Sequence, residues 1–403
     1  MDEDQALSEG INIKKWNDRK NSNFASFYAN MPNENGAIEM SSTLQLSIPG
    51  RADSIRSFKA NGGRIAGVLP IHYPRALFRA FNILPVEIWG PPGIDPVFGS
   101  AHLQAYICSI VRNALSFTQT KSFQSVDILV VPHACDSLQG LGSILLDFVS
   151  IDQPVIPLYL PRSGGMNQTA FLEKEFETVY QRLESWTGYS PSQDEMMQRI
   201  LNEEEADQKL ASLHKQRKNL SLSDIEFYRL VRAREFLTAE GFSEIAQKAH
   251  DQVQDQVLDG IPIILSGILP EPMALLEEIS RMGGHIVADD LACSGRRLYP
   301  PGRSQESFLR MAESLLGAAP SWSWGSPIQD RLEHLLTMIQ TSGARGVVFY
   351  NIKFCEPELF DLPNLRRGLQ ELAIPSTVVE MDINDPLSNQ TLTRIEAFLE
   401  MIA

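Results

Sequence analysis

The chain has 403 residues, and its hydrophobic fraction of 43% and charged fraction of 21% are those of an ordinary globular protein with two or three domains. Its formal net charge of −15 argues against nucleic acid and against a membrane as a partner, because binding to phosphate groups requires a basic surface. A local basic pocket for a phosphorylated small molecule remains open at the neighbouring Arg296 and Arg297.

The cysteine content and the hydropathy pattern indicate a cytoplasmic protein. Four cysteines in so long a chain do not make a disulfide framework, which favours a reducing compartment. The first residues, Met-Asp-Glu-Asp-Gln, lack the basic and apolar regions of a signal peptide. No apolar run approaches the roughly 20 residues that a membrane span needs.

The chain divides into four predicted regions. Residues 1–60 are polar and Asn-rich, and we interpret them as a partly helical extension. Residues 61–166 and 260–403 each alternate short β-branched runs with helical stretches, which is typical of a parallel sheet covered by helices. Residues 167–259 are rich in Glu, Gln, Lys and Leu and predict a helical insertion. The predicted strands lie at 65–69, 85–89, 127–132 and 155–160, and again at 261–266, 285–289, 346–351 and 376–381.

The two strand-bearing regions resemble each other. Gly67-Val-Leu-Pro70 recurs 200 positions later as Gly267-Ile-Leu-Pro270, and a Pro and an Ala-Leu pair follow in both places. Such self-similarity, with four strands in matching order, indicates two copies of one α/β domain.

Two cysteines occupy equivalent places in these copies. Cys135 follows the third strand of the first copy and Cys355 the third strand of the second, where ligands bind in parallel sheets. Cys108, on a helix predicted at 101–118, completes a triangle if the two domains face each other. We expect these strand and helix ends to expose the thiolates, and three thiolates can hold an iron–sulfur cluster with one iron left open.

Other interpretations of the cysteines stay open. No Cys-x-x-Cys pair is present, so buried structural thiols are an alternative, and a zinc site with four cysteines is the other metal option. Cys293 is either a fourth ligand or a small buried thiol in the loop after the second strand of copy two.

From about residue 64 to its C-terminus, the sequence resembles the 2-hydroxyacyl-CoA dehydratase and benzoyl-CoA reductase family, of the 2-hydroxyglutaryl-CoA dehydratase D-component type. The most specific segments are Ile107-Cys-Ser109 with Arg112, His133-Ala-Cys-Asp136, Ala288-Asp-Asp-Leu291 with Gly295-Arg296, and Lys353-Phe-Cys-Glu-Pro357. The resemblance implies two flavodoxin- or Rossmann-like domains and a [4Fe-4S] cluster bound by Cys108, Cys135 and Cys355.

The resemblance also implies partners and a reaction. These are a CoA-thioester substrate, a homologous second subunit in a hetero- or homodimer, and a separate ATP-dependent iron–sulfur activator that supplies low-potential electrons. The reaction would be a radical dehydration, as in a lyase, or a reduction, as in an oxidoreductase. A non-catalytic subunit that relays electrons or has a structural role is the alternative.

The sequence departs from the family at a turn that usually carries acidic residues, where this chain has His72-Tyr-Pro-Arg75. His72 or Arg75 would then have a different role there. His133, beside Cys135, either bonds a cluster sulfur or moves a proton, or is an ordinary loop histidine. We expect Asp136 and Ser137 to cap a helix. The turn at 162–165 is either a plain turn or a phosphate contact.

Overall fold

The computed structural model describes residues 46–162, 167–251, 253 and 259–403. Most of the predicted N-terminal extension, residues 1–45, lies outside the described residues, and only helix α3 (Arg51–Ala60) and its approach belong to the part that is described. In the ranges given, no helix combines the length and the apolar character that crossing a bilayer requires.

Two four-stranded parallel sheets form the framework, as the sequence predicts. The first contains β1 (Arg64–Val68), β2 (Ile83–Glu87), β3 (Ile128–His133) and β4 (Val155–Tyr159), and the second contains β5 (Ile261–Gly267), β6 (Gly284–Leu291), β7 (Gly346–Ile352) and β8 (Ser376–Met381). The spatial orders are β2-β1-β3-β4 and β6-β5-β7-β8, so both sheets have one topology. The α/β fold class is therefore confirmed, and the matching topology is compatible with a flavodoxin-like duplication.

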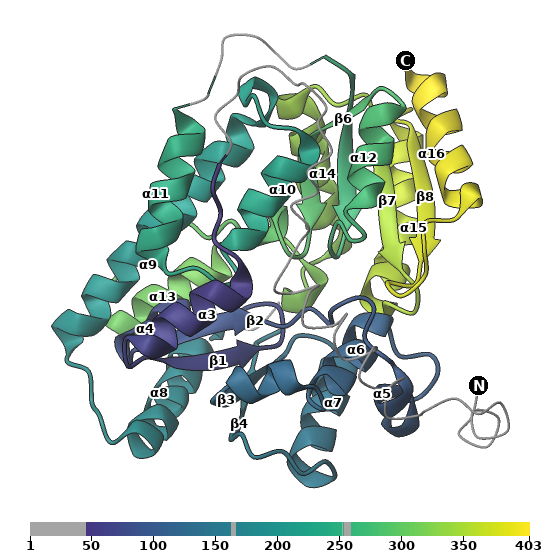
Figure 1. Ribbon diagram of the computed structural model, residues 1–403. Coiled ribbons are helices and arrows are strands. Elements are labelled where there is room, and N and C mark those ends of the chain that lie inside the picture. Colours follow the sequence, from purple (N-terminus) through teal and green to yellow (C-terminus); the bar gives the residue numbers. More distant parts are fainter. Residues whose placement is uncertain (1–45, 163–166, 252, 254–258) are drawn as a thin grey trace, which may run out of the picture.

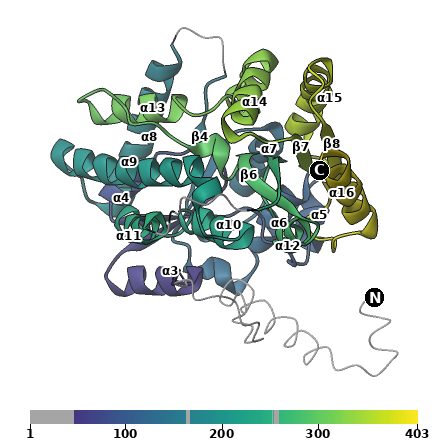
Figure 2. The ribbon, with the colours of Figure 1, turned by 90° about the horizontal axis from the view of Figure 1, so that it is seen from above.

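The strands form where the apolar runs are continuous. Every residue of β7, Gly-Val-Val-Phe-Tyr-Asn-Ile, is buried, and β3 is buried up to its last residue, because helices cover both faces of a parallel sheet. In the second sheet α12 (Ala274–Arg281) and α16 (Asn389–Ile402) cover one face, and α14 (Ile328–Ser342) and α15 (Glu356–Glu371) cover the other (Figure 2). The strand predicted at 85–89 begins two residues earlier, since Ile83 and Leu84 pair with β1.

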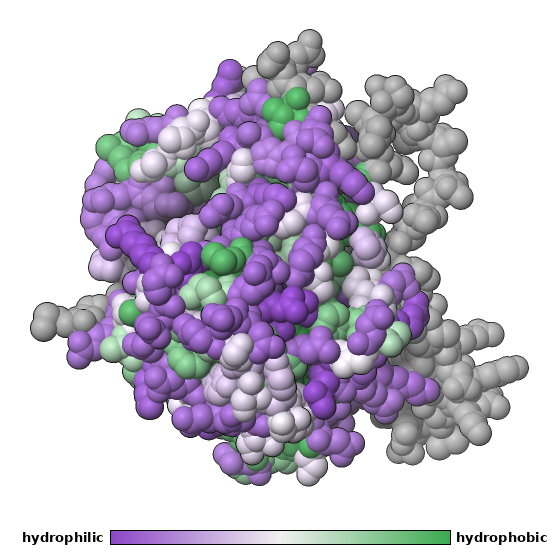
Figure 3. Space-filling model, turned by 90° about the vertical axis from the view of Figure 1, so that its left-hand side faces the viewer, coloured by the Kyte–Doolittle hydropathy of each residue, from purple (hydrophilic) through white to green (hydrophobic). Residues whose placement is uncertain are grey.

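The segment between the sheets is helical, as predicted. It contains α8 (Gln168–Thr187), α9 (Gln193–Lys215), α10 (Asp224–Ala233) and α11 (Ala239–His250), which pack beside the sheets (Figure 1). Capping boxes begin α9 at Ser192 and α10 at Ser223, each with a glutamate three residues later. The side of the molecule on which α8, α9 and α11 lie is mostly hydrophilic, with small scattered apolar patches (Figure 3).

One large apolar core runs through both sheets and the helical segment, from Ile65 in β1 to Leu399 in α16. A second, smaller cluster lies between the second sheet and the α14–α15 layer. The carboxyl ends of the two sheets meet: Glu87 at the end of β2 pairs with Arg297 beyond β6. The loops that follow the strands of both sheets are therefore neighbours.

The prediction of one continuous helix at 101–118 is wrong. Two helices occupy the region, α5 (Val97–His102) and α6 (Ser109–Phe117), and Cys108 precedes the second instead of lying within a helix. The backbone N–H of Gly99 in α5 donates to Ser116 Oγ in α6 at 2.8 Å, so the two helices pack against each other. This packing requires a turn between them, which helix propensity does not reveal.

Candidate functional site

Cys108, Cys135 and Cys355 each stand directly before the first residue of a helix. Cys108 is the N-cap of α6, Cys135 the N-cap of α7 (Asp136–Asp147) and Cys355 the N-cap of α15. The last two follow β3 and β7, which are inner strands of their sheets. The positive ends of three helix dipoles therefore adjoin three thiols, an arrangement that favours a bound anion.

The expectation that these thiols are exposed is wrong for two of them. Cys108 is 6% and Cys355 7% exposed, and Cys135 is half-buried. All four cysteines of the chain are free of disulfides. The thiols are buried because the loops after the strands of one domain are covered by those of the other.

The three thiols influence one another electrostatically. Burial raises the pKa of Cys135 to about 12, with a further contribution from Cys108. Burial also raises the pKa of Cys355 well above its ordinary value, and Cys108 and Cys135 both add to the shift. The three thiols are therefore near enough to act on one another electrostatically.

The amides that follow each cysteine act in the opposite direction. Backbone N–H groups of Val111 and Ile110 favour a thiolate at Cys108, although burial outweighs them and the pKa of Cys108 is raised. Ser137 and Leu138 do the same for Cys135. The backbone N–H of Glu358 does the same for Cys355.

The donor set can be compared with what different metal groups require. Among the residues that the structure describes, no group of three or more His, Cys, Asp or Glu side chains surrounds a position for a metal ion. A four-iron cluster holds its thiolates farther apart than a single zinc ion does, and it carries negative charge. Three thiols at helix N-termini have the chemistry that such a cluster requires, since the amides there favour negative charge.

Cys293 differs from the other three because it is not the N-cap of a helix: it lies in the turn between β6 and the 3-10 helix Gly295–Arg297. It is 4% exposed, and burial raises its pKa well above the ordinary value. The largest charged contributions to this pKa come from Arg232, Glu235, Glu271 and Asp289.

The two histidines singled out from the sequence have different surroundings. His133 ends β3 and is half-buried, with its ring edge against Tyr159 at 4.6 Å between centroids. Neither of its ring nitrogens has a hydrogen-bond partner among the described residues. His72 is 0% exposed, and its Nδ1 and Nε2 lie 2.8 Å from the hydroxyls of Tyr299 and Ser323.

The basic pocket that the sequence leaves open at Arg296 and Arg297 is not formed by these two side chains. Arg296 is buried in contact with Asp290 at 2.8 Å and with Glu358, and Arg297 binds both carboxylate oxygens of Glu87. Their positive charges are already neutralised by buried carboxylates. The sequence does not reveal this pairing, because Glu358 and Glu87 are far from the two arginines along the chain.

Three other positions singled out from the sequence have surroundings that the sequence did not indicate. Asp136 is the first residue of α7 and Cys135 its N-cap, so the capping role expected for Asp136 and Ser137 is wrong. Arg75 is buried between Glu87, at 2.9 Å, and Asp207. In the turn at 162–165, Arg162 donates to the carbonyl of Trp322 at 3.2 Å, and residues 163–165 lie outside the described residues.

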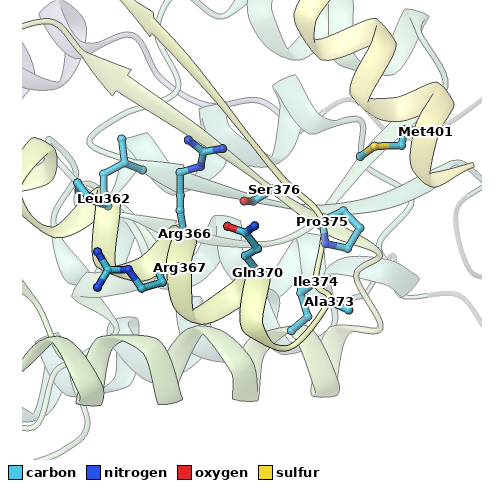
Figure 4. Close-up of a pocket in the computed structure, with 10 residues that line it drawn as sticks. Leu362, Arg366, Arg367, Gln370, Ala373, Ile374, Pro375, Ser376 and Met401 are labelled. Carbon is cyan, nitrogen blue, oxygen red and sulfur yellow. The ribbon is translucent and has the colours of Figure 1, made fainter.

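A large surface hollow lies away from the cysteines. It has a volume of about 730 Å³ and lies between the second half of α15 and the beginning of β8, beside Arg366, Arg367 and Ser376 (Figure 4). Cys355 precedes α15 at the opposite, carboxyl edge of the sheet. Size alone therefore does not locate the site.

Comparison with known proteins decides the family. The model of the family described as 2-hydroxyglutaryl-CoA dehydratase, D-component, matches residues 70–402. The chain belongs to this family. The family assignment confirms the resemblance, and the match includes all three cysteines at the helix N-termini.

Individual members of the family are similar over most of their length. Lactoyl-CoA dehydratase subunit beta of Anaerotignum propionicum is 26% identical over 358 residues, which are 86% of this chain and 94% of that protein. (R)-2-hydroxyglutaryl-CoA dehydratase subunit beta of Acidaminococcus fermentans is 22% identical and covers 86% of this chain and 95% of its own. A benzoyl-CoA reductase subunit of Thauera aromatica is 26% identical, with 77% and 84% covered.

Sequence reasoning missed the residues of the second domain that approach α6. The loop after β8 contacts α6 through Asp382, Ile383 and Asn384. A signal was available, because this loop follows the fourth strand of copy two and therefore lies at the same edge as the loops that carry the cysteines.

Proposed function

We propose that this protein is the iron–sulfur subunit of a dehydratase or reductase that acts on a CoA thioester. The observation that carries the proposal is that Cys108, Cys135 and Cys355 stand at three helix N-termini, near enough to act on one another electrostatically. Family membership supports it, since the similar proteins are named as subunits of lactoyl-CoA dehydratase, 2-hydroxyglutaryl-CoA dehydratase and benzoyl-CoA reductase.

In this proposal Cys108, Cys135 and Cys355 hold a [4Fe-4S] cluster. When bound, such a cluster supplies low-potential electrons and an iron that can take an oxygen ligand. The chain's own residues provide the setting: the amides of Ile110, Val111, Ser137 and Leu138 favour negative charge at the sulfurs. Burial of Cys108 and Cys355 keeps water away from the site.

His133 has no assigned role at the cysteines in this proposal. A Cβ atom at Gly142, in the middle of α7, would lie 2.9 Å from His133 Nε2, and the ring packs against Tyr159, whereas Cys135 precedes the first residue of that helix. Burial lowers the pKa of His133, which favours the neutral ring.

The names of the similar proteins indicate an assembly. Each is named as one subunit of a larger enzyme, so we propose a homologous second subunit for this chain. An ATP-dependent activator that delivers the electrons completes the proposed system, as the family resemblance implies.

A non-catalytic subunit that relays electrons or has a structural role is the second candidate. The turn at His72 and Arg75 favours this candidate, because it lacks the carboxylate that the family resemblance leads us to expect on the substrate side. Here His72 is fully buried between two hydroxyls, and Arg75 is 11% exposed at its side chain and ion-paired. Turnover of a CoA thioester by this subunit and its activator, without any second subunit, would exclude this candidate.

The test is the iron and sulfide content after anaerobic purification. The wild-type chain should contain roughly four iron and four sulfide atoms. Cys108→Ala, Cys135→Ala and Cys355→Ala should each lose most of them, whereas Cys293→Ala, a matched change at a buried cysteine, should not. A wild-type chain without iron after anaerobic reconstitution, or three variants with unchanged iron, would refute the proposal.

The type of reaction is tested separately. Products formed from a 2-hydroxyacyl-CoA and from an aromatic acyl-CoA distinguish dehydration from reduction. Loss of water without net reduction identifies the lyase, and a reduced ring identifies the oxidoreductase.

A further inference from the structure

Helix α6, which begins after Cys108, is held from two sides. On the side of its own domain, the amide of Asn113 donates to the carbonyl of Pro91 at 3.0 Å. Gly90 has a φ of +64°, and a Cβ atom there would lie 1.9 Å from the carbonyl oxygen of Ile110. The first turn of α6 is therefore pressed against the loop after β2.

The other side of α6 is held by the second domain. Arg112 forms an ion pair with Asp382 at 3.0 Å, and Asn113 and Asn384 exchange two amide hydrogen bonds of 2.8 and 3.1 Å. The backbone N–H of Ile383 also donates to Ser109 Oγ at 3.2 Å. Together, Arg112, Asn113, Asp382 and Asn384 form what we term the interdomain clasp.

The same loop touches the segment that carries Cys355. The backbone N–H of Lys353 donates to the carbonyl of Met381 at 2.9 Å, and Lys353 Nζ lies 3.5 Å from Asp385. Residues 382–385 therefore lie between the helix of Cys108 and the loop of Cys355. A shift of this loop would change the separation of the two thiols.

We infer that the interdomain clasp positions Cys108 against Cys355 across the boundary between the two domains. Arg112, Asn113, Asp382 and Asn384 are positioning residues, because they act through the cysteines and are not ligands themselves. The ion pair is half-buried, with both side chains 16% exposed. Limited contact with solvent strengthens this charge-assisted hydrogen bond, which has a defined geometry. The inference rests on the proposed function only for the identity of the group that the cysteines bind.

The first experiment needs no cluster. The full chain is prepared without iron, and alkylation of each cysteine is followed by mass spectrometry. Asp382→Arg places two guanidinium groups together, and their repulsion should open the contact between α6 and residues 382–385. Loss of one charge-assisted hydrogen bond in such a local opening should make alkylation of Cys108 about tenfold faster. Arg112→Asp should have the same effect. The double reversal should return the rate of Cys108 toward that of the wild type.

The second experiment uses the loaded protein. In Asp382→Arg the cluster should be lost to a chelator several times faster, and its electron paramagnetic resonance spectrum should change, with recovery in the double reversal. Arg310→Ala is the control, because it removes an ion pair of similar exposure, 14% and 9%, between α13 (Ser307–Leu316) and α9. A faster loss of the cluster that came only from lower overall stability would also appear in Arg310→Ala.

If Asp382→Arg does not fold, Asp382→Asn removes the charge and keeps the shape, and the same measurements apply. Wild-type alkylation rates and an unchanged spectrum in the clasp variants would overturn the inference and leave the proposed function intact. Faster alkylation of Cys108 in a chain that binds no iron would support the clasp while refuting the proposed function.

Discussion

The buried contact between Glu87 and Arg297 joins the two domains, and its removal gives a sharp test of the packing. Glu87 is 1% exposed and accepts hydrogen bonds from Arg297 at 2.6 Å, Arg75 at 2.9 Å, Tyr73 at 2.8 Å and Trp89 at 2.8 Å. Glu87→Gln keeps the shape but leaves two buried guanidinium groups without a full counter-charge. Breaking such a pair costs about 3–5 kcal/mol.

Urea unfolding at pH 7, followed by circular dichroism and by tryptophan fluorescence, measures this loss. Coincident transitions from the two probes check the two-state treatment. Glu278→Gln is the matched control, because Glu278 pairs with Arg281 at the surface, with side chains 29% and 66% exposed. The control should lose less than about 1 kcal/mol. An equal loss in both variants would refute the reasoning.

The pH dependence of this difference follows from the pKa of Glu87. Burial alone would raise that pKa, but Arg297 and Arg75 outweigh it and hold it well below 4.5. A carboxylate whose pKa falls on folding stabilises the folded state fully above the unfolded pKa, and this stability is lost as the pH falls through the folded pKa. The stability difference between wild type and Glu87→Gln should therefore be constant from pH 7 to about 5 and shrink below that.

Two further predictions concern buried or strained positions beside the candidate site. Phe354 has a φ of +63° and is 44% exposed, so Phe354→Gly should change the unfolding free energy by less than about 1 kcal/mol, whereas the β-branched Phe354→Val should cost more than the glycine variant. The reverse order in urea unfolding would contradict the strain argument. His72→Phe retains an aromatic ring beside Trp324, at 4.1 Å between ring centroids, but leaves two buried hydroxyls without their partner, and should cost about 1–3 kcal/mol. Unchanged thermal unfolding would show that these hydroxyls find other partners.

Much of the fold could be predicted because strand and helix signals are local. The eight apolar runs predicted as strands correspond to strands β1 to β8, and helices α7 and α15 begin shortly after β3 and β7. The recurrence of Gly67-Val-Leu-Pro70 as Gly267-Ile-Leu-Pro270 indicates two copies of one domain from the order of residues alone. These signals depend on periodicity and burial within a few residues, which the sequence carries directly.

Charge pairing and the environment of the thiols could not be predicted in this way. Arg296 and Arg297 look like a free basic pair in the sequence, yet each meets a carboxylate more than five positions away, Arg297 as far away as Glu87. The thiols of Cys108 and Cys355 were expected to be exposed and are buried. Both errors arise because the contacts are tertiary: Arg296 pairs with Glu358 from another element of its own sheet region, and Arg297 pairs with Glu87 from the first sheet.

The sequence by itself determined the order of the strands, the helical segment between the two sheets, and the positions of Cys135 and Cys355 directly after β3 and β7. The tertiary structure decided where Cys108 lies, because its helix is held by Asp382 and Asn384, about 270 positions later. Contacts over such a distance form only when two domains pack, and no local pattern encodes them. The three candidate cysteines are named from the sequence, whereas their burial and the contacts that hold the helix of Cys108 come from the packing of the two sheets with their helices.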